Sequence, residues 1–252
     1  MDFTLTREQE AIQRAAAEFA KGEFDKETAL KHETSHSFPL DIWKKACQLG
    51  FIGIHFPEEY GGQDYGIFEN SLVVEEFCRH DSGIGIAISL ADFSSEIILR
   101  YGTHDQKKTY LIPLTRGEAI SSGGYTEPNH GSDITLMDTT AVKTGDTYII
   151  NGAKTFITNG TISNFALVLC QTNPQAEPTH RGQSIIIVER DTPGYTTADI
   201  GEKMGIKMSP TAELSFNNVT VPAANLVGQK KLIDPPWNGV FHHFTQGFCL
   251  IS

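Results

Sequence analysis

The chain has 252 residues, and 39% of them are apolar, which is enough to bury a substantial core and excludes a disulfide-stapled miniprotein or a disordered chain. Its 31 acidic and 20 basic side chains give a net charge of −11 at pH 7. Because a surface of that sign repels phosphates, we expect neither nucleic acid nor anionic lipid as a partner.

The cysteines predict reduced thiols in an intracellular protein. They form no CxxC pair and no zinc-finger spacing, and they are Cys47, Cys78, Cys170 and Cys249. No run approaches the ~20 apolar residues that cross a bilayer, and the first residues have no signal-peptide or transit-peptide character. We therefore expect a cytoplasmic protein without a membrane span.

Residues 1–118 predict an all-helical domain. Thr6 with Gln9, and Thr103 with Gln106, match the capping box that begins a helix. Further helices are expected over residues 39–50, 67–78 and 84–99, with a loop over 51–62. The segment 84–99 is apolar nearly all round, so we expect that helix to be buried.

From residue 119 the pattern changes to short β-rich runs separated by Gly, Asn and Pro. A hairpin is expected over residues 139–150, with its turn at 144–146, and further strands over 164–171, 183–190 and 213–221. Short connections without helices predict an antiparallel barrel or sandwich over residues 119–228, so the expected class is α+β. Residues 229–252 are expected to be a tail that completes no further element.

Common nucleotide-binding and serine-hydrolase motifs are absent, and two other clusters stand out. Residues 125–133 combine hydroxyls with Gly131, a composition that suits an anion or a heteroaromatic ring, although a tight Pro/Gly turn is an equal alternative. In the second cluster, residues 154–160, Phe156 and Thr158 are two apart and so share one face of a strand. The pairs His80–Asp81 and His242–His243 lack a third ligand, so we expect no metal.

Both clusters resemble the flavin-binding signatures of the acyl-CoA dehydrogenase family. The family pattern T-E-P-x-x-G-S-D is similar to residues 126–133, and (W/F)-I-T-N is similar to residues 156–159. Further matching segments follow in the family's order at residues 56–62, 102–111, 191–194, 203–205 and 216–222. The resemblance covers residues 1–228, and it implies the family's N-terminal helical and middle β domains.

The resemblance also implies a set of site residues. Those implied for the cofactor FAD are Gly123, Gly124, Tyr125, Thr126, Ser132, Phe156, Ile157 and Thr158, and those implied for acyl-CoA are Ser132, His180 and Arg181. Backbone groups and the Thr126 hydroxyl would face the isoalloxazine, and Arg181 would approach the CoA phosphates, although a solvated loop arginine is an equal alternative. Glu127 is expected to serve the turn rather than the chemistry.

The function that the resemblance implies is oxidation of an acyl-CoA thioester to 2-enoyl-CoA, with electrons passing through FAD to an electron-transfer flavoprotein, in a homo-oligomer. Family members carry their catalytic Glu on a C-terminal four-helix bundle, whereas no Glu follows Glu213 in this sequence. We therefore expect no catalytic base in this chain, a truncated or frameshifted reading frame, and little turnover. The alternatives are a non-catalytic subunit that binds acyl-CoA or a full-length homologue, and an unstable fragment with an exposed apolar patch. The acyl-chain specificity is not predicted.

Overall fold

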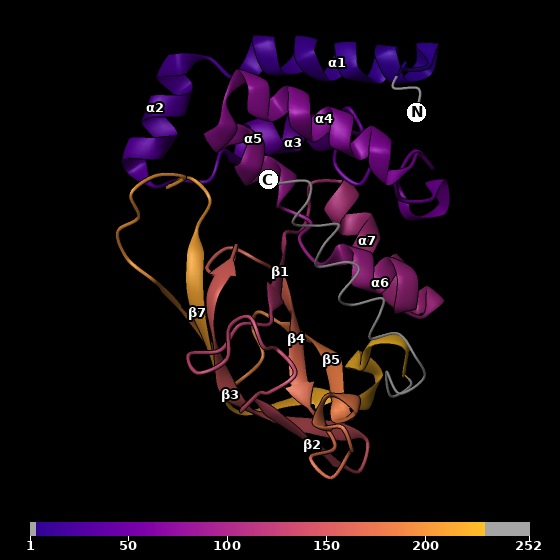
Figure 1. Cartoon of the computed structure of the whole chain (residues 1–252), viewed down its shortest axis with the longest axis vertical. Helices are drawn as coiled ribbons and strands as arrows, with labels where there is room; N and C mark the ends of the chain where they lie inside the picture. The colour runs from indigo at the N-terminus through magenta and orange to yellow at the C-terminus, as the bar shows by residue number, and fades with distance from the viewer. Residues whose placement is uncertain (1–3, 230–252) are drawn as a thin grey trace.

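The computed structural model describes residues 4–229, in which a helical domain and a β-sheet domain lie end to end (Figure 1). The helices come first in the chain, and most of them occupy the upper part of that view, while the strands occupy the lower part. This arrangement confirms the predicted α+β class, a helical domain followed by a β domain. Beyond residue 229, the predicted tail lies outside the described residues.

The helical domain combines predicted and unpredicted elements. Both capping boxes are confirmed, because the hydroxyls of Thr6 and Thr103 accept hydrogen bonds from the Gln9 and Gln106 backbone amides. Gly50, with φ +77°, follows the predicted helix that ends beside it. The helices are α1 (Arg7–Glu23), α2 (Lys26–Ser35), α3 (Leu40–Gln48), α4 (Ile67–His80), α5 (Ser82–Ser89), α6 (Ser95–Tyr101) and α7 (His104–Thr115), with a short 3-10 turn, η1, at Glu58–Tyr60.

Helix α2 was not predicted because its apolar residues do not repeat at helical spacing. Ala29 is its buried residue, and the helix begins where the Asp25 carboxylate accepts hydrogen bonds from the Glu27 and Thr28 amides. A strong N-cap, rather than an apolar face, therefore defines this element.

The prediction of a single helix over residues 84–99 is wrong, because the chain breaks into α5 and α6. Between them, the Leu90 carbonyl accepts from the Asn159 side chain at 2.6 Å, and the Ala91 carbonyl accepts from the Ser121 amide at 2.9 Å. In a continuous helix, these two carbonyls would accept hydrogen bonds from amides four residues later. Ser94, with φ +75°, then turns the chain toward α6. The predicted burial of the segment is confirmed, as its buried apolar residues show: Ile84, Ala87, Ile88, Ala91, Ile97 and Ile98.

The β domain is one curled seven-stranded sheet with the order β1-β4-β2-β3-β7-β6, and β5 pairs with β4. The predicted hairpin is confirmed as β2 with β3, while β1 and β6 were not predicted. The strands are β1 (Ser121–Gly124), β2 (Thr140–Thr144), β3 (Thr147–Thr158), β4 (Phe165–Gln171), β5 (Gln183–Glu189), β6 (Tyr195–Asp199) and β7 (Thr211–Pro222). Most pairings are antiparallel, as predicted, but β1 and β2 both run parallel to β4, so the sheet is mixed.

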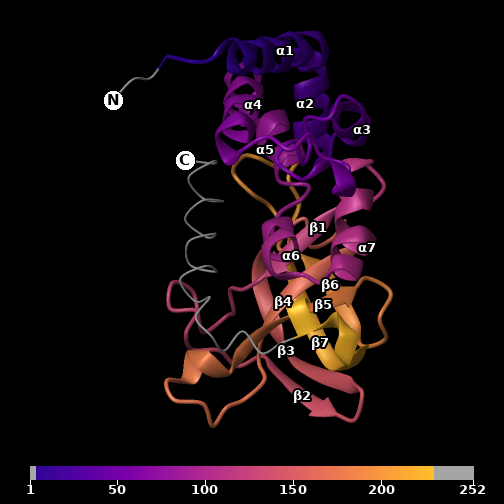
Figure 2. The same cartoon turned by 90° about the vertical axis from the view of Figure 1, so that its right-hand side faces the viewer.

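The two domains share part of their cores. Met208, from the segment between β6 and β7, is buried in the core of the helical domain together with Ile120. In Figure 1 that segment rises from the sheet toward α2 and α5. At the opposite end of the sheet, the Gln106 side chain donates to the Ala224 and Leu226 carbonyls, and Figure 2 shows α6 and α7 lying against the sheet there. The domains are therefore fixed to each other at two separate places.

Among residues 4–229, Cys47, Cys78 and Cys170 are free thiols, whereas Cys249 and the pair His242–His243 lie outside the described residues. Burial raises the pKa of the Cys47 and Cys170 thiols to about 12, which keeps both protonated. Within the described part of the chain, no helix has the length and apolar character needed to cross a membrane.

Candidate functional site

The structure brings the two sequence clusters together at the start of the β domain. The Thr155 amide on β3 donates to the Thr126 carbonyl at 2.9 Å. One residue earlier on β3, the Lys154 ammonium donates to the Tyr125 carbonyl at 3.2 Å and to Glu127 Oε1 at 2.8 Å. Residues that are nearly 30 positions apart in sequence therefore form one continuous site.

Strand β1 leads into this site with a backbone that has no side chain at two positions. A Cβ on Gly123 would lie 2.1 Å from Ser94 Oγ and 2.4 Å from the Tyr125 ring, so any other residue there would displace one of these side chains. Gly124 and Tyr125 are also buried, and burial raises the pKa of the Tyr125 hydroxyl. These three residues can therefore serve a ligand mainly through their backbone groups.

The peptide group between Tyr125 and Thr126 has a defined orientation. Its carbonyl points to the Lys154 ammonium in the core, and the N–H of a trans peptide points to the opposite side. No hydrogen bond joins the Thr126 N–H to another residue within 4–229. Since Thr126 is only partly buried, this N–H and the Thr126 hydroxyl are available to an incoming acceptor such as a heteroaromatic ring.

Glu127 is buried, with 3% of its surface exposed, and it holds the turn that the sequence predicts. Its carboxylate accepts from the Asp138 amide at 2.6 Å and the Thr139 amide at 2.9 Å, in addition to Lys154. Burial alone would raise its pKa, but the charge of Lys154 and these hydrogen bonds outweigh burial and lower it. Glu127 is therefore an ionised structural group.

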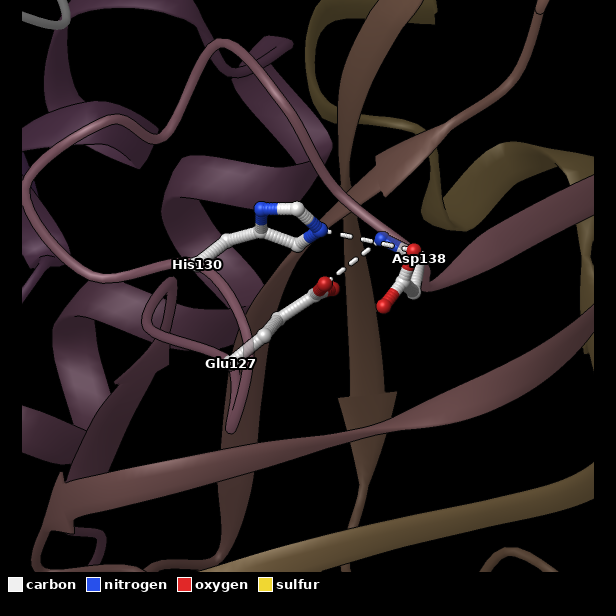
Figure 3. A group of neighbouring side chains, drawn as sticks. All are labelled: Glu127, His130 and Asp138. Atoms are coloured by element: carbon white, nitrogen blue, oxygen red, sulfur yellow. Dashed lines mark hydrogen bonds and ion pairs between the residues drawn. The ribbon is translucent and has the colours of Figure 1, made fainter.

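Residues 128–137 form the loop that Glu127 closes, and Ser132 lies exposed within it. Within the loop, His130 Nε2 lies 3.4 Å from Asp138 Oδ1, and the Asn129 side-chain amide donates to Asp138 Oδ2. Ligand atoms of Glu127, His130 and Asp138 lie within 4.8 Å of one another (Figure 3). Because both Glu127 oxygens already accept hydrogen bonds, one of them from an ammonium group, we interpret this trio as a hydrogen-bonded network rather than a metal site.

The second cluster contains a bulge in β3. Lys154 pairs with Leu214 and Ile157 pairs with Ala212, so β3 has one extra residue there. Phe156 lies in the bulge with φ +58°, and 67% of its surface is exposed, while Thr158 is partly buried. The Ile157 side chain packs in the sheet core, which leaves only its backbone for a ligand.

Comparison with known proteins identifies the family of this site. A sequence profile described as "Acyl-CoA dehydrogenase, N-terminal domain" matches residues 6–118, and one described as "Acyl-CoA dehydrogenase, middle domain" matches residues 122–219. The chain belongs to the acyl-CoA dehydrogenase family. The domains that the resemblance implied are the two that match.

Curated relatives of this acyl-CoA dehydrogenase family member support the assignment. An acryloyl-CoA reductase (NADH) of Anaerotignum propionicum is 39% identical over 232 residues, which cover 91% of this chain and 58% of the relative. A short-chain specific acyl-CoA dehydrogenase of Clostridium acetobutylicum is 37% identical over 91% of this chain and 60% of the relative. The chain thus spans about 60% of the length of these relatives.

Solved structures share the fold. The acyl-CoA dehydrogenase of Geobacillus kaustophilus has a TM-score of 0.90 at 35% identity, covering 99% of this chain and 65% of the other. A chain from a structure of the electron transferring flavoprotein of Acidaminococcus fermentans has a TM-score of 0.85 at 39% identity, covering 92% and 60%. A glutaryl-CoA dehydrogenase of Mycobacterium smegmatis in complex with FADH2 has a TM-score of 0.81 at 31% identity, covering 90% and 57%.

Asn159, the last residue of the family's second signature, has a role that the sequence analysis missed. Its buried side chain donates to the Leu90 carbonyl at 2.6 Å and to the Ser121 carbonyl at 3.4 Å. It therefore ties the end of β3 to β1 and to the break between α5 and α6. The signal available in the sequence was its position, since Asn159 is a polar residue directly after the predicted strand residues 156–158.

The residues implied for the CoA phosphates lie in a short turn, Thr179–Gly182, before β5. Arg181 is exposed and His180 is partly buried. The next residue, Gln183, donates to the Ile134 and Thr135 carbonyls in the loop that contains Ser132. The structure therefore joins this turn to the first signature, although it does not bring Arg181 into contact with Ser132 through any bond within residues 4–229.

Proposed function

We propose that this chain contributes the flavin and acyl-CoA face of an enzyme that oxidises an acyl-CoA thioester to a 2-enoyl-CoA, with electrons passing to an electron-transfer flavoprotein. The observation that carries the proposal is the junction of the two family signatures, where the Thr155 amide bonds the Thr126 carbonyl. Bound FAD supplies the hydride acceptor for such a reaction. The FADH2 complex of the glutaryl-CoA dehydrogenase supports this cofactor, and the electron transferring flavoprotein structure supports this partner.

The residues at the junction have the chemistry that a flavin requires. The Thr126 N–H and hydroxyl and the Thr158 hydroxyl supply donors for ring heteroatoms. Phe156 offers an exposed aromatic face that can stack on the ring and exclude water from one side. In the proposed complex, Ser132 donates to a phosphate or to the thioester ligand, and Arg181 pairs with a CoA phosphate.

We assign none of the carboxylates beside this site as the base that removes the α-proton. The pKa of Glu127 is held below its ordinary value, and hydrogen bonds from Thr135 and Asn129 respectively lower those of Asp133 and Asp138. A general base works best with a pKa near the working pH. We therefore propose that residues 1–252, expressed alone, bind the ligands but turn over slowly or not at all.

The test is the visible spectrum of purified residues 1–252, recorded before and after an anaerobic panel of acyl-CoA thioesters. We expect bound FAD whose absorption bands shift without bleaching. Bleaching would contradict the proposal that this chain lacks a base for the α-proton. The base would then have to be another carboxyl group of the chain. Because one relative is named as a reductase, the matched arm adds 2-enoyl-CoA thioesters to the photoreduced protein and measures reoxidation.

A non-catalytic subunit is the second candidate, and the lowered pKa values of Glu127, Asp133 and Asp138 favour it, because none of these carboxyl groups suits a general base. Such a subunit would bind acyl-CoA without FAD or associate with a full-length homologue. Size-exclusion chromatography with a full-length acyl-CoA dehydrogenase, together with titration of the apo-protein with acyl-CoA, distinguishes it from the first candidate. A colourless protein that elutes with the homologue would support this second function.

A further inference from the structure

The Lys154–Glu127 pair is the most deeply buried pair of opposite charges among residues 4–229. Lys154 has no exposed surface and Glu127 has 3%, and Nζ lies 2.8 Å from Oε1. Removing two charges from water is costly, and apolar residues of similar size often stabilise a protein equally well. Stability alone therefore does not explain why the Lys154–Glu127 pair is buried.

The pair has contacts on both sides of the proposed flavin site. From β3, the Lys154 ammonium holds the Tyr125 carbonyl, which directs the Thr126 N–H away from the core. Glu127, in the first signature, accepts hydrogen bonds from the backbone amides of Asp138 and Thr139. It thereby joins both ends of the loop of residues 128–137. One ion pair thus determines the orientation of a peptide group and the closure of a loop.

The position of Lys154 on β3 adds a third constraint. It is the last regularly paired residue before the bulge, and Phe156, two residues later, has φ +58°. Such a backbone conformation persists only where surrounding contacts fix it. Since the Lys154 side chain is anchored to the first signature, the start of the bulge is anchored there as well.

We propose that the Lys154–Glu127 pair is a positioning element of the flavin face, which acts through the Thr126 peptide group and the β3 bulge and not by contact with the ligand. This inference rests on the proposed function. It predicts that the charges are needed for flavin binding more than for folding. A pair that served stability alone would affect flavin binding only to the extent that it unfolds the protein.

The test compares the double variant Glu127→Gln/Lys154→Met with the wild-type chain of 252 residues. The control is Val221→Ala, which removes buried volume at the far end of β7, away from the pair. FAD affinity is measured by fluorescence titration at a temperature where circular dichroism shows all three proteins folded. We expect at least a tenfold weaker FAD affinity and a shifted flavin absorption spectrum for the double variant, and neither for the control.

The possible outcomes separate the two proposals. If the wild type binds no FAD, the proposed function fails, and this inference fails with it. If the wild type binds FAD and the folded double variant binds it equally well with the same spectrum, the positioning role alone is overturned. If the double variant does not fold, Glu127→Gln/Lys154→Gln, which also leaves no uncompensated charge, takes its place with the same expectation. Lys154→Arg keeps the charge, and it should retain more FAD affinity than the double variant.

Discussion

Each domain contains a cluster of charged groups, a buried one of Glu127 and Lys154 in the β domain and a partly buried one of His55, Asp92, Glu96 and Arg100 in the helical domain. The clusters differ in how completely hydrogen bonds satisfy them. In the β domain, the Glu127 carboxylate accepts three hydrogen bonds, and its pKa is lowered despite burial. In the helical domain, burial raises the pKa of Asp92 to about 6, although the nearby charge of His55 opposes that rise. The comparison teaches that partners, more than depth of burial, determine whether a buried carboxyl group stays ionised.

The helical cluster contains a second carboxyl group with the opposite behaviour. Glu96 Oε1 lies 2.5 Å from His55 Nε2, and Arg100 bonds the other oxygen. Burial would raise the pKa of Glu96, but His55 and Arg100 lower it. Glu96 thus has the close side-chain partners in this cluster, and Asp92 is the acid with weaker compensation for burial.

The largest expected effect is on the cluster of the β domain. Lys154→Met leaves an unpaired buried carboxylate, so we expect the free energy of unfolding to fall by about 3–5 kcal/mol. Glu127→Gln added to this variant should restore much of the loss, because no uncompensated charge remains. Urea unfolding of the four members of this cycle measures both effects. A single variant that loses less than about 1 kcal/mol would show that the pair is weakly coupled.

The helical cluster should respond in the opposite direction. An acid whose pKa is raised, such as Asp92, holds its proton more tightly in the folded chain than in the unfolded chain. The free energy of unfolding therefore rises as the pH falls below about 6. Above that pH, the ionised carboxylate destabilises the fold. A rise from 3.8 to about 6 corresponds to about 3 kcal/mol. Asp92→Asn should therefore stabilise the protein by about 1–3 kcal/mol at pH 7.5.

Chemical unfolding of Asp92→Asn at pH 7.5 and pH 4.5 provides the measurement, and the gain should shrink at the lower pH. Asp146→Asn, in the exposed turn between β2 and β3, is the control and should change little at either pH. Destabilisation by Asp92→Asn at pH 7.5 would mean that attraction to His55 outweighs burial.

An effect of intermediate size is expected where the two domains meet. Asn159→Ala removes the two hydrogen bonds that this buried side chain donates to the Leu90 and Ser121 carbonyls, which costs about 1–3 kcal/mol. Thermal unfolding measures the loss, and hydrogen exchange of residues 90–94 shows whether the break between α5 and α6 loosens. Asn129→Ala, at an exposed position, is the control. Equal losses of stability in the two variants would contradict the conclusion that Asn159 links β3 to β1 and to the break.

The smallest effect on stability is expected at the exposed aromatic residue. Phe156→Ala should change the free energy of unfolding by less than about 0.5 kcal/mol, because most of the ring is exposed. In the same variant, the fluorescence of bound FAD should increase as ring stacking is lost. Val142→Ala, at another exposed apolar position in the sheet, should leave the flavin unaffected. Unchanged flavin fluorescence in Phe156→Ala would remove this residue from the site.

The sequence predicts what depends on nearby residues. The capping boxes, the hairpin of β2 and β3 and the change from helices to strands all follow from patterns within about ten positions. The break between α5 and α6 does not, because the groups that donate hydrogen bonds to its carbonyls, on Ser121 and Asn159, lie in the other domain.

The features of the candidate site also divide into those that the sequence predicts and those that it does not. Its two signatures are legible in the sequence, but the burial of Lys154 is not, since a lysine in a strand is ordinarily exposed and its partner is 27 positions away. The side chain of Ile157 is directed into the core by a bulge that strict alternation along a strand does not foresee.

Met208, which enters the helical core from the β domain, also bears on how the molecule unfolds. A fragment of residues 1–118 would lack both Met208 and Ile120, and its core would be left with a hole. The composition divides the chain at residue 118, but the unit that opens and closes cooperatively extends across that division. The slowest-exchanging amides of the helices and of the sheet should therefore report a single common opening free energy.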